Sequence, residues 1–160
     1  MKLPDRLRKM DDIFTPLKKC KGKPVAITTW GIGTMGDPSM LLLVDRLCTA
    51  HLVRLLVGYS KQTHDPEYLL SVARVMNGMK TDRGGKWEVR FLPSFHTKLW
   101  IIGRSAYGGS CNLAPNTCIN RMWKVPIGDA WNHFELYWKQ AAQVSKTTNL
   151  LLVPQARIHA

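Results

Sequence analysis

Two apolar segments, each followed by an Asp-Pro pair, constrain the fold of this chain more than any other feature. Pro24–Trp30 (PVAITTW) is short and rich in β-branched residues, and Leu52–Val57 is a second apolar run, so both predict strands. Asp37-Pro38 follows the first strand and Asp65-Pro66 follows the second. An aspartate N-cap with proline at the first helical position is typical of a helix start. The chain therefore predicts strand–helix–strand–helix, which is an α/β pattern.

The rest of the chain adds strands and further helices to this beginning. The two capped helices are expected to run to about Ala50 and Met79. The other expected elements are a basic amphipathic helix over residues 5–20, strands at Lys86–Leu92, Thr97–Ile102 and Ser105–Gly108, a long loop over 113–130, a strand at Phe134–Trp138, and a helix or strand around Leu150–Val153. The prediction is one domain over residues 1–160, an α/β sandwich with a mixed central sheet flanked by helices.

A glycine-rich stretch after the first strand invites a nucleotide-binding interpretation, which we reject. Gly31, Gly33 and Gly36 spell GxGxxG. In a dinucleotide-binding turn the helix begins inside this motif, so that the pyrophosphate meets the helix N-terminus. Here the cap signal Asp37-Pro38 comes after the third glycine. We therefore expect a loop at the carboxyl end of the strand, and no dinucleotide cofactor.

The charge of the chain favours a polyanionic partner. Among 160 residues, 23 are Lys or Arg and 11 are Asp or Glu, which gives a net charge of +12. Basic side chains bind nucleic acid by releasing counterions from its phosphates. The cluster Lys18, Lys19, Lys21 and Lys23 is either a solvated helix end or a contact to a nucleic-acid backbone.

Cysteine spacing and apolar runs bear on the compartment. The 4 cysteines form no CxxC pair, so a structural zinc site is disfavoured and free thiols in a reducing compartment are expected. The N-terminus shows no signal-peptide pattern, and the run Met40–Val44 is too short to span a bilayer. These features predict a cytoplasmic protein without a membrane partner.

Four polar residues around an apolar strand form the candidate site. His96 and Lys98 are two residues apart on a predicted strand, so they share a face. Ser110 and Asn112 follow the glycine turn after that strand. An imidazole, an ammonium, a hydroxyl and an amide suit a phosphate, and imidazole can serve as nucleophile or proton carrier near neutral pH.

These residues resemble the signature of the phospholipase D superfamily, HxK followed by GSxN. His96 and Lys98 match the first part, and Gly109, Ser110 and Asn112 match the second. Asn132–Glu135 resembles the downstream N-x-x-E element of that superfamily. Gly103 stands where the superfamily has an aspartate, and the spacing to GSxN is one residue shorter.

The resemblance implies a metal-independent phosphodiesterase that acts on nucleic acid, with DNA favoured over RNA. It implies a phosphohistidine on His96, phosphate binding by Lys98 and Asn112, orientation by Ser110, and a hydrogen bond from His96 to Glu135. Superfamily members use two HxK motifs, so a chain with one is expected to work as a homodimer. No cofactor and no metal are expected.

Other interpretations remain open at the level of the sequence. The same fold could serve as a catalytically weak nucleic-acid-binding dimer, which Gly103 favours, or as a phospholipid hydrolase. For His133, contact with substrate is the less favoured role, and surface or core roles are favoured for His51, His64 and His159. The 6 tryptophans are expected in the core or at a dimer interface.

Overall fold

The computed structural model describes residues 6–7, 10–19, 21–110, 112–114 and 122–144. The strands are β1 (Arg6–Leu7), β2 (Pro24–Trp30), β3 (Leu52–Tyr59), β4 (Trp87–Pro93), β5 (Lys98–Ile102), β6 (Ser105–Gly109), β7 (Met122–Val125) and β8 (Ala142–Gln143). The helices are a short 3₁₀ helix η1 (Met10–Ile13), α1 (Phe14–Lys19), α2 (Pro38–Leu47), α3 (Pro66–Met76) and α4 (Ile127–Gln140).

The described strands form one mixed sheet in the order β1-β7-β6-β5-β2-β3-β4-β8. Strands β2, β3 and β4 are parallel, with Trp30 opposite Gly58 at the carboxyl end. Strand β5 runs antiparallel to β2, and Leu99 near its start pairs with Thr28. The start of β5 therefore lies at the same edge of the sheet as the carboxyl ends of the parallel strands.

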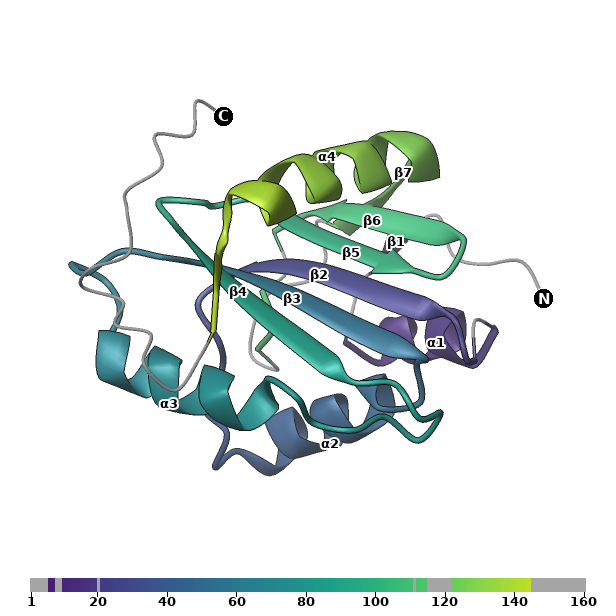
Figure 1. Cartoon of the computed structure of the whole chain (residues 1–160). Helices are drawn as coiled ribbons and strands as arrows, with labels where there is room; N and C mark the ends of the chain where they lie inside the picture. The colour runs from purple at the N-terminus through teal and green to yellow at the C-terminus, as the bar shows by residue number, and fades with distance from the viewer. Residues whose placement is uncertain (1–5, 8–9, 20, 111, 115–121, 145–160) are drawn as a thin grey trace.

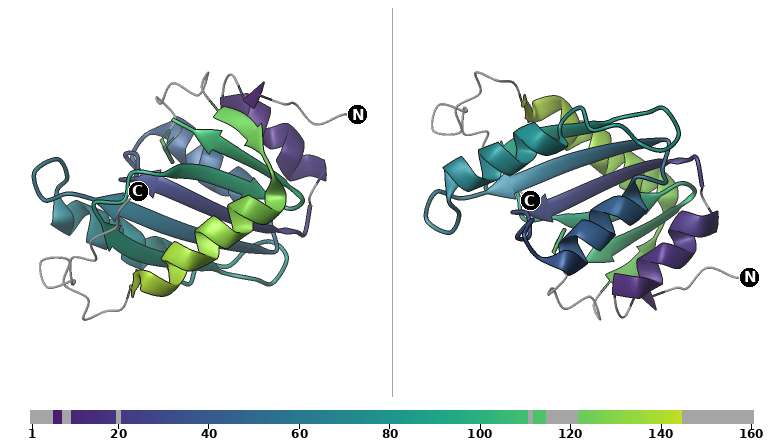
Figure 2. Two further views of the ribbon diagram at one scale, coloured as in Figure 1. Left: turned by 90° about the horizontal axis from the view of Figure 1, so that it is seen from above. Right: turned by 90° about the horizontal axis from the view of Figure 1, so that it is seen from below.

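Helices cover both faces of the sheet. Helices α1, α2 and α3 lie on one face and α4 crosses the other (Figures 1 and 2). The core divides accordingly: Trp100 and Tyr107 point into the larger cluster with α2 and α3, whereas Leu99 and Ile101 pack with Phe134 of α4. Successive side chains of β5 thus point to opposite faces of the sheet, as they do in any regular strand. The predicted α/β sandwich with a mixed sheet is confirmed.

Both Asp-Pro pairs start helices as predicted. The Asp37 carboxylate accepts a hydrogen bond from the backbone N–H of Ser39 at 2.8 Å. The Asp65 carboxylate accepts one from the backbone N–H of Glu67 at 3.0 Å. Each carboxylate satisfies an N–H group that the first turn of a helix leaves without a partner.

The predicted strand at Phe134–Trp138 is wrong, because this segment lies inside helix α4. The buried residues of α4 are Ala130, Phe134 and Trp138. They recur every four residues, which is the spacing of one helix face rather than the alternation of a strand.

The ends of the chain differ from the prediction as well. The expected loop over 113–130 contains β7 and the start of α4, so that prediction is wrong over this part. The expected helix over 5–20 is shorter, and Arg6–Leu7 instead pairs with β7. The element expected around residues 150–153 lies outside the described residues. None of the helices in the described ranges combines the length and the apolar composition that a bilayer crossing requires.

Candidate active site at the carboxyl edge of the sheet

The connection from β4 to β5 directs His96 to the surface. Ser94 adopts a left-handed conformation with φ of 58°, and its backbone N–H donates to the carbonyl of Tyr59 at 2.9 Å. The next side chain, Phe95, is buried, and His96 is exposed. Non-glycine residues seldom adopt positive φ, so this turn is a locally costly conformation beside the site.

Gly58 allows this connection to cross β3 at close range. A methyl group at Gly58 would overlap the backbone carbonyl of Phe95. The residue before His96 is therefore seated directly on the backbone of β3, and no side chain can be inserted between them.

Trp30, the last residue of β2, lies between two histidines. The His96 imidazole stacks on the Trp30 indole, with ring centroids 3.6 Å apart and planes 21° apart. The His64 ring meets the same indole edge-on, at 4.8 Å and 73°. Aromatic pairs prefer offset stacking and edge-to-face contact, so both histidines are held by one indole.

His64 is fixed in orientation and kept neutral. Its Nδ1 accepts a hydrogen bond from the backbone N–H of Ser60 at 3.1 Å, which leaves the ring proton on Nε2. Burial lowers the pKa of His64; the backbone hydrogen bond with Ser60 partly offsets this, and the neighbouring His96 adds to the lowering. The sequence favoured a surface or core role for His64 and contained no local signal for this pairing, because 32 positions separate it from His96.

The segment after β6 is tied to the end of β2. The Asn112 Oδ1 accepts a hydrogen bond from the backbone N–H of Trp30 at 2.8 Å. The backbone N–H of Leu113 donates to the Thr29 Oγ1 at 2.8 Å, and the Gly33 N–H donates to the Leu113 carbonyl at 2.9 Å. Asn112 is thereby brought beside the residue that carries the His96 ring.

These contacts also explain the glycine motif. Gly31 has φ of 74°, and a Cβ there would lie 2.6 Å from the His64 Nε2. A Cβ at Gly33 would lie 3.0 Å from Ala114. The helix begins at Pro38, after the third glycine, as predicted. Because Gly31 and Gly33 have no side chains, His64 can pack against the first and Ala114 against the second.

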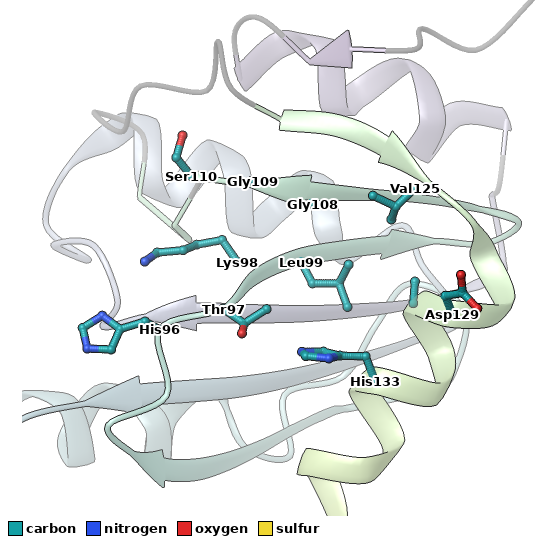
Figure 3. A pocket seen from close by; sticks show the side chains of 11 residues that line it. His96, Thr97, Lys98, Leu99, Gly108, Gly109, Ser110, Val125, Asp129 and His133 are labelled. Carbon is teal, nitrogen blue, oxygen red and sulfur yellow. The ribbon is translucent and has the colours of Figure 1, made fainter. Parts of the chain in front are cut away.

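His96 and Lys98 open onto a groove on the α4 side of the sheet. The groove has a volume of about 510 Å³. In Figure 3 both side chains extend to the same end of it, while the Ser110 hydroxyl points away from Lys98. Its lining consists of His96, Thr97, Lys98, Leu99, Gly108, Gly109, Ser110, Val125, Asp129, Ala130 and His133. Burial lowers the pKa of the Lys98 ammonium.

The structure does not bring Glu135 to His96. The Glu135 Oε1 accepts a hydrogen bond from the Arg54 Nη1 at 3.1 Å, on the face of the sheet that α4 covers. The predicted bond between Glu135 and His96 is therefore absent. The reason is the helix: Glu135 projects from the middle of α4 toward β3, whereas the prediction assumed a strand.

The four lysines of the basic cluster lie at the other end of β2. Lys18 and Lys19 are in the last turn of α1, and Lys21 and Lys23 directly precede β2; all four are exposed. Strand β2 has 7 residues. At about 3.3 Å per residue, roughly 20 Å separate this cluster from Trp30.

Gly103 occupies the hairpin between β5 and β6. Ile102 pairs with Ser105, so Gly103 and Arg104 form a two-residue turn, and Gly103 has φ of 60°. Glycine with positive φ at the first central position is typical of a type II′ turn. An aspartate at this position would be strained in this turn.

In the part of the chain that the structure describes, no three His, Cys, Asp or Glu side chains lie close enough together to hold a metal ion.

Comparison with known proteins identifies the fold. No protein-family profile matches the sequence, and no curated protein does. Nuc, a phospholipase D family member from Salmonella typhimurium, superposes with a TM-score of 0.52 at 13% identity, over 82% of this chain and 90% of Nuc. NucT from Helicobacter pylori superposes with a TM-score of 0.53 at 12% identity, over 83% of this chain and 91% of NucT.

TrmBL2, an archaeal chromatin protein, superposes with a TM-score of 0.46 at 18% identity. The alignment covers 82% of this chain but only 49% of TrmBL2, so the chain spans about half of that protein. The fold is defined by the first two superpositions. The protein has a phospholipase D-like α/β fold, with its histidine–lysine pair at the carboxyl edge of the sheet.

Proposed function

We propose that the protein is a metal-independent phosphodiesterase that acts as an endonuclease on nucleic acid, with DNA preferred over RNA. One observation carries the proposal: His96 and Lys98 lie together at one end of the same groove, in a chain of net charge +12. Because an exposed imidazole beside an ammonium suits attack on a bound phosphate, the pair fits phosphodiester chemistry. The whole of residues 1–160 would act as one domain in the cytoplasm.

The reaction begins with attack by a ring nitrogen of His96 on phosphorus. A nitrogen–phosphorus bond forms and the bond from phosphorus to the leaving oxygen breaks, while a second imidazolium gives its proton to that oxygen. Water then attacks the phosphohistidine, its proton passes to the second imidazole, and the nitrogen–phosphorus bond breaks. The phosphate monoester is released and both histidines return to their starting states.

Lys98 and Asn112 would bind the phosphoryl oxygens, where negative charge increases in the transition state. Ser110 would orient the phosphate or the groups next to it. The Trp30 indole would fix the orientation of the His96 ring. The resemblance had implied this role for Glu135. The positive charge comes from Lys98 and imidazolium, so the scheme requires no metal and no cofactor.

The second imidazole would come from another copy of the chain. His96 is exposed at the carboxyl ends of the parallel strands, where a second subunit could approach it. In a homodimer with the site on the two-fold axis, His96 of the partner subunit would serve as the acid. His64 cannot readily take this role, because its Nε2 faces the backbone of Gly31 and its Nδ1 is already bonded.

The test is cleavage of plasmid, single-stranded DNA and RNA in excess EDTA by the wild type and by His96→Ala. His51→Ala is the matched control, because His51 is an exposed histidine at the far end of the sheet. We expect cleavage that survives EDTA, persists in the control and disappears in His96→Ala. Full cleavage by His96→Ala would refute the proposal.

Mixing tests the dimer. When wild-type and His96→Ala chains are unfolded and refolded together, the activity of a site that needs both histidines should fall as the square of the wild-type fraction. A linear loss would mean that each chain works alone.

A second candidate is a nucleic-acid-binding protein without nuclease activity. The pairing of Glu135 with Arg54 favours it, since the histidine then lacks a carboxylate brace. DNA binding that is retained in the wild type without any cleavage would support this candidate.

A further inference from the structure

The groove beyond His96 and Lys98 contains a buried polar atom without a partner. The Nε2 of His133 is inaccessible to solvent and makes no hydrogen bond with any described residue. Buried polar atoms are nearly always paired, so this exception singles out His133 among the residues that line the groove. Figure 3 shows the His133 ring reaching from α4 into the groove, on the side opposite Ser110.

The walls of the groove suit a flat, uncharged group. Leu99, Val125 and Ala130 provide an apolar surface, while Gly108 and Gly109 contribute no side chains on the β6 side. A volume of about 510 Å³ falls within the range of small-molecule sites, roughly 300–1,000 Å³. The His133 ring packs against Tyr137 at a centroid distance of 4.7 Å and lies 6.2 Å from the Phe95 ring.

The charged side chains of the groove lie toward opposite ends. Lys98 and His96 lie at one end, and the Asp129 carboxylate lies toward the other (Figure 3). A phosphate is attracted to the Lys98 end and repelled from the Asp129 end. Because burial lowers the pKa of His133, its ring is neutral near pH 7 and suits an uncharged partner.

We propose that this groove is a nucleobase subsite, in which the base next to the scissile phosphate lies between β6 and α4 and hydrogen-bonds to the His133 Nε2 after the ring turns to uncover that atom. The inference rests on the proposed function, since it takes the scissile phosphate to be bound at His96 and Lys98. A base seated here has left its stack, so the subsite takes an unpaired nucleotide.

The test compares two ligands that differ only in the base. Deoxycytidine 5′-monophosphate and 2-deoxyribose 5-phosphate are titrated by calorimetry against the wild type, His133→Phe and His133→Gln. Cytosine carries both donors and acceptors, so it can pair with either tautomer of His133. His51→Phe is the control, as it makes the same change at an exposed histidine far from the groove.

We expect the wild type to bind the nucleotide about tenfold more tightly than the sugar phosphate, through base burial and one hydrogen bond. His133→Phe should weaken only the nucleotide, by about threefold to tenfold, because a neutral hydrogen bond contributes that much. His133→Gln should recover part of the loss, and the control should match the wild type.

Equal affinities of the two ligands in the wild type would overturn the subsite. So would an equal loss for both ligands in His133→Phe, or a failure of both to bind at millimolar concentration. These outcomes are distinct from a failure of the proposed function: a protein that binds the nucleotide through His133 but cleaves no polynucleotide keeps the subsite and loses the nuclease.

Discussion

The imidazole of His96 lies flat against the indole of Trp30, with ring centroids 3.6 Å apart. Trp30 ends the central strand β2, and its backbone N–H is bonded to Asn112. The proposed nucleophile is therefore positioned by an aromatic plane that is anchored in the sheet, although it lies on a connecting segment itself. A stacked ring restricts rotation of the imidazole.

Removing this plane should slow cleavage. Trp30→Ala is expected to lower kcat about threefold to tenfold, because an aromatic pair contributes about 0.5–1.5 kcal/mol. Trp30→Phe keeps a stacking surface and should retain most of the rate. Single-turnover kinetics would measure both variants, and equal rates for Trp30→Ala and the wild type would exclude a positioning role.

A methyl group at Gly58 should displace the segment that carries His96. Gly58→Ala is expected to cost about 1–3 kcal/mol of stability through overpacking against Phe95. It should also lower kcat, since His96 follows directly. Gly128→Ala is the matched change: a Cβ there meets nothing within 4 Å, and in a helix the substitution is neutral or stabilising by at most about 1 kcal/mol. Denaturant unfolding and kcat of both variants give the comparison.

The alkaline limit of activity should be set by Lys98. Burial lowers the pKa of this ammonium below its ordinary value of 10.5. Phosphate binding needs the charged form, so cleavage should decline at a lower pH than an ordinary lysine would impose. Lys98→Arg keeps its charge at all accessible pH values and should lose this decline, even where its overall rate is reduced. An alkaline decline of identical position in both proteins would assign it to another group.

Acidification should destabilise the fold through His133. Burial lowers the pKa of His133 below 6.5, its value in the unfolded chain. As the pH falls below 6.5, the unfolded chain binds the proton first, so the free energy of unfolding decreases until the folded-state pKa is passed. His133→Phe removes this contribution.

The measurement is Tm at about pH 7.5 and about pH 5. His133→Phe should lose less Tm than the wild type, and it should be at least as stable at the higher pH, because it replaces a buried polar atom that has no partner. His51→Phe should follow the wild type. An unchanged acid loss in His133→Phe would show that other groups dominate.

Changes at Glu135 should affect stability rather than the chemical step. The carboxylate pairs with Arg54, whose Nε also lies 3.7 Å from Glu88. Glu135→Gln should lower stability by up to about 1 kcal/mol, the range of partly exposed ion pairs. The pH profile of cleavage should remain unchanged. A shifted profile would show that Glu135 takes part in the chemical step.

The sequence predicted the central sheet well because its signals are local. The two Asp-Pro caps and the apolar strands between them depend on residues within a few positions of each other, and β2, α2, β3 and α3 lie where predicted. Helix α4 was missed because Phe134–Trp138 is short and aromatic, and an apolar run of that length suits either a strand or a helix.

For the site, the sequence identified the HxK pair, and the structure brings His96 and Lys98 to one groove. It gave no indication of the contact of His96 with Trp30, and it treated contact of His133 with substrate as the less favoured role. Trp30 and His133 lie 66 and 37 positions from His96 in the chain, so only the pairing of distant strands and the crossing of α4 reveal them. The position of Glu135 was predicted wrongly because the segment Phe134–Trp138 was interpreted as a strand and not as part of helix α4.

If the proposed substrate contacts both the lysines before β2 and His96, the separation between them sets its minimum length. The 7 residues of β2 span about 20 Å. A polynucleotide advances about 3.4 Å per nucleotide along its strand, so about six nucleotides are needed to reach from one end to the other. In the proposed nuclease, shorter oligonucleotides would engage only the His96 end, so the affinity for nucleic acid should rise steeply once the oligonucleotide reaches this length.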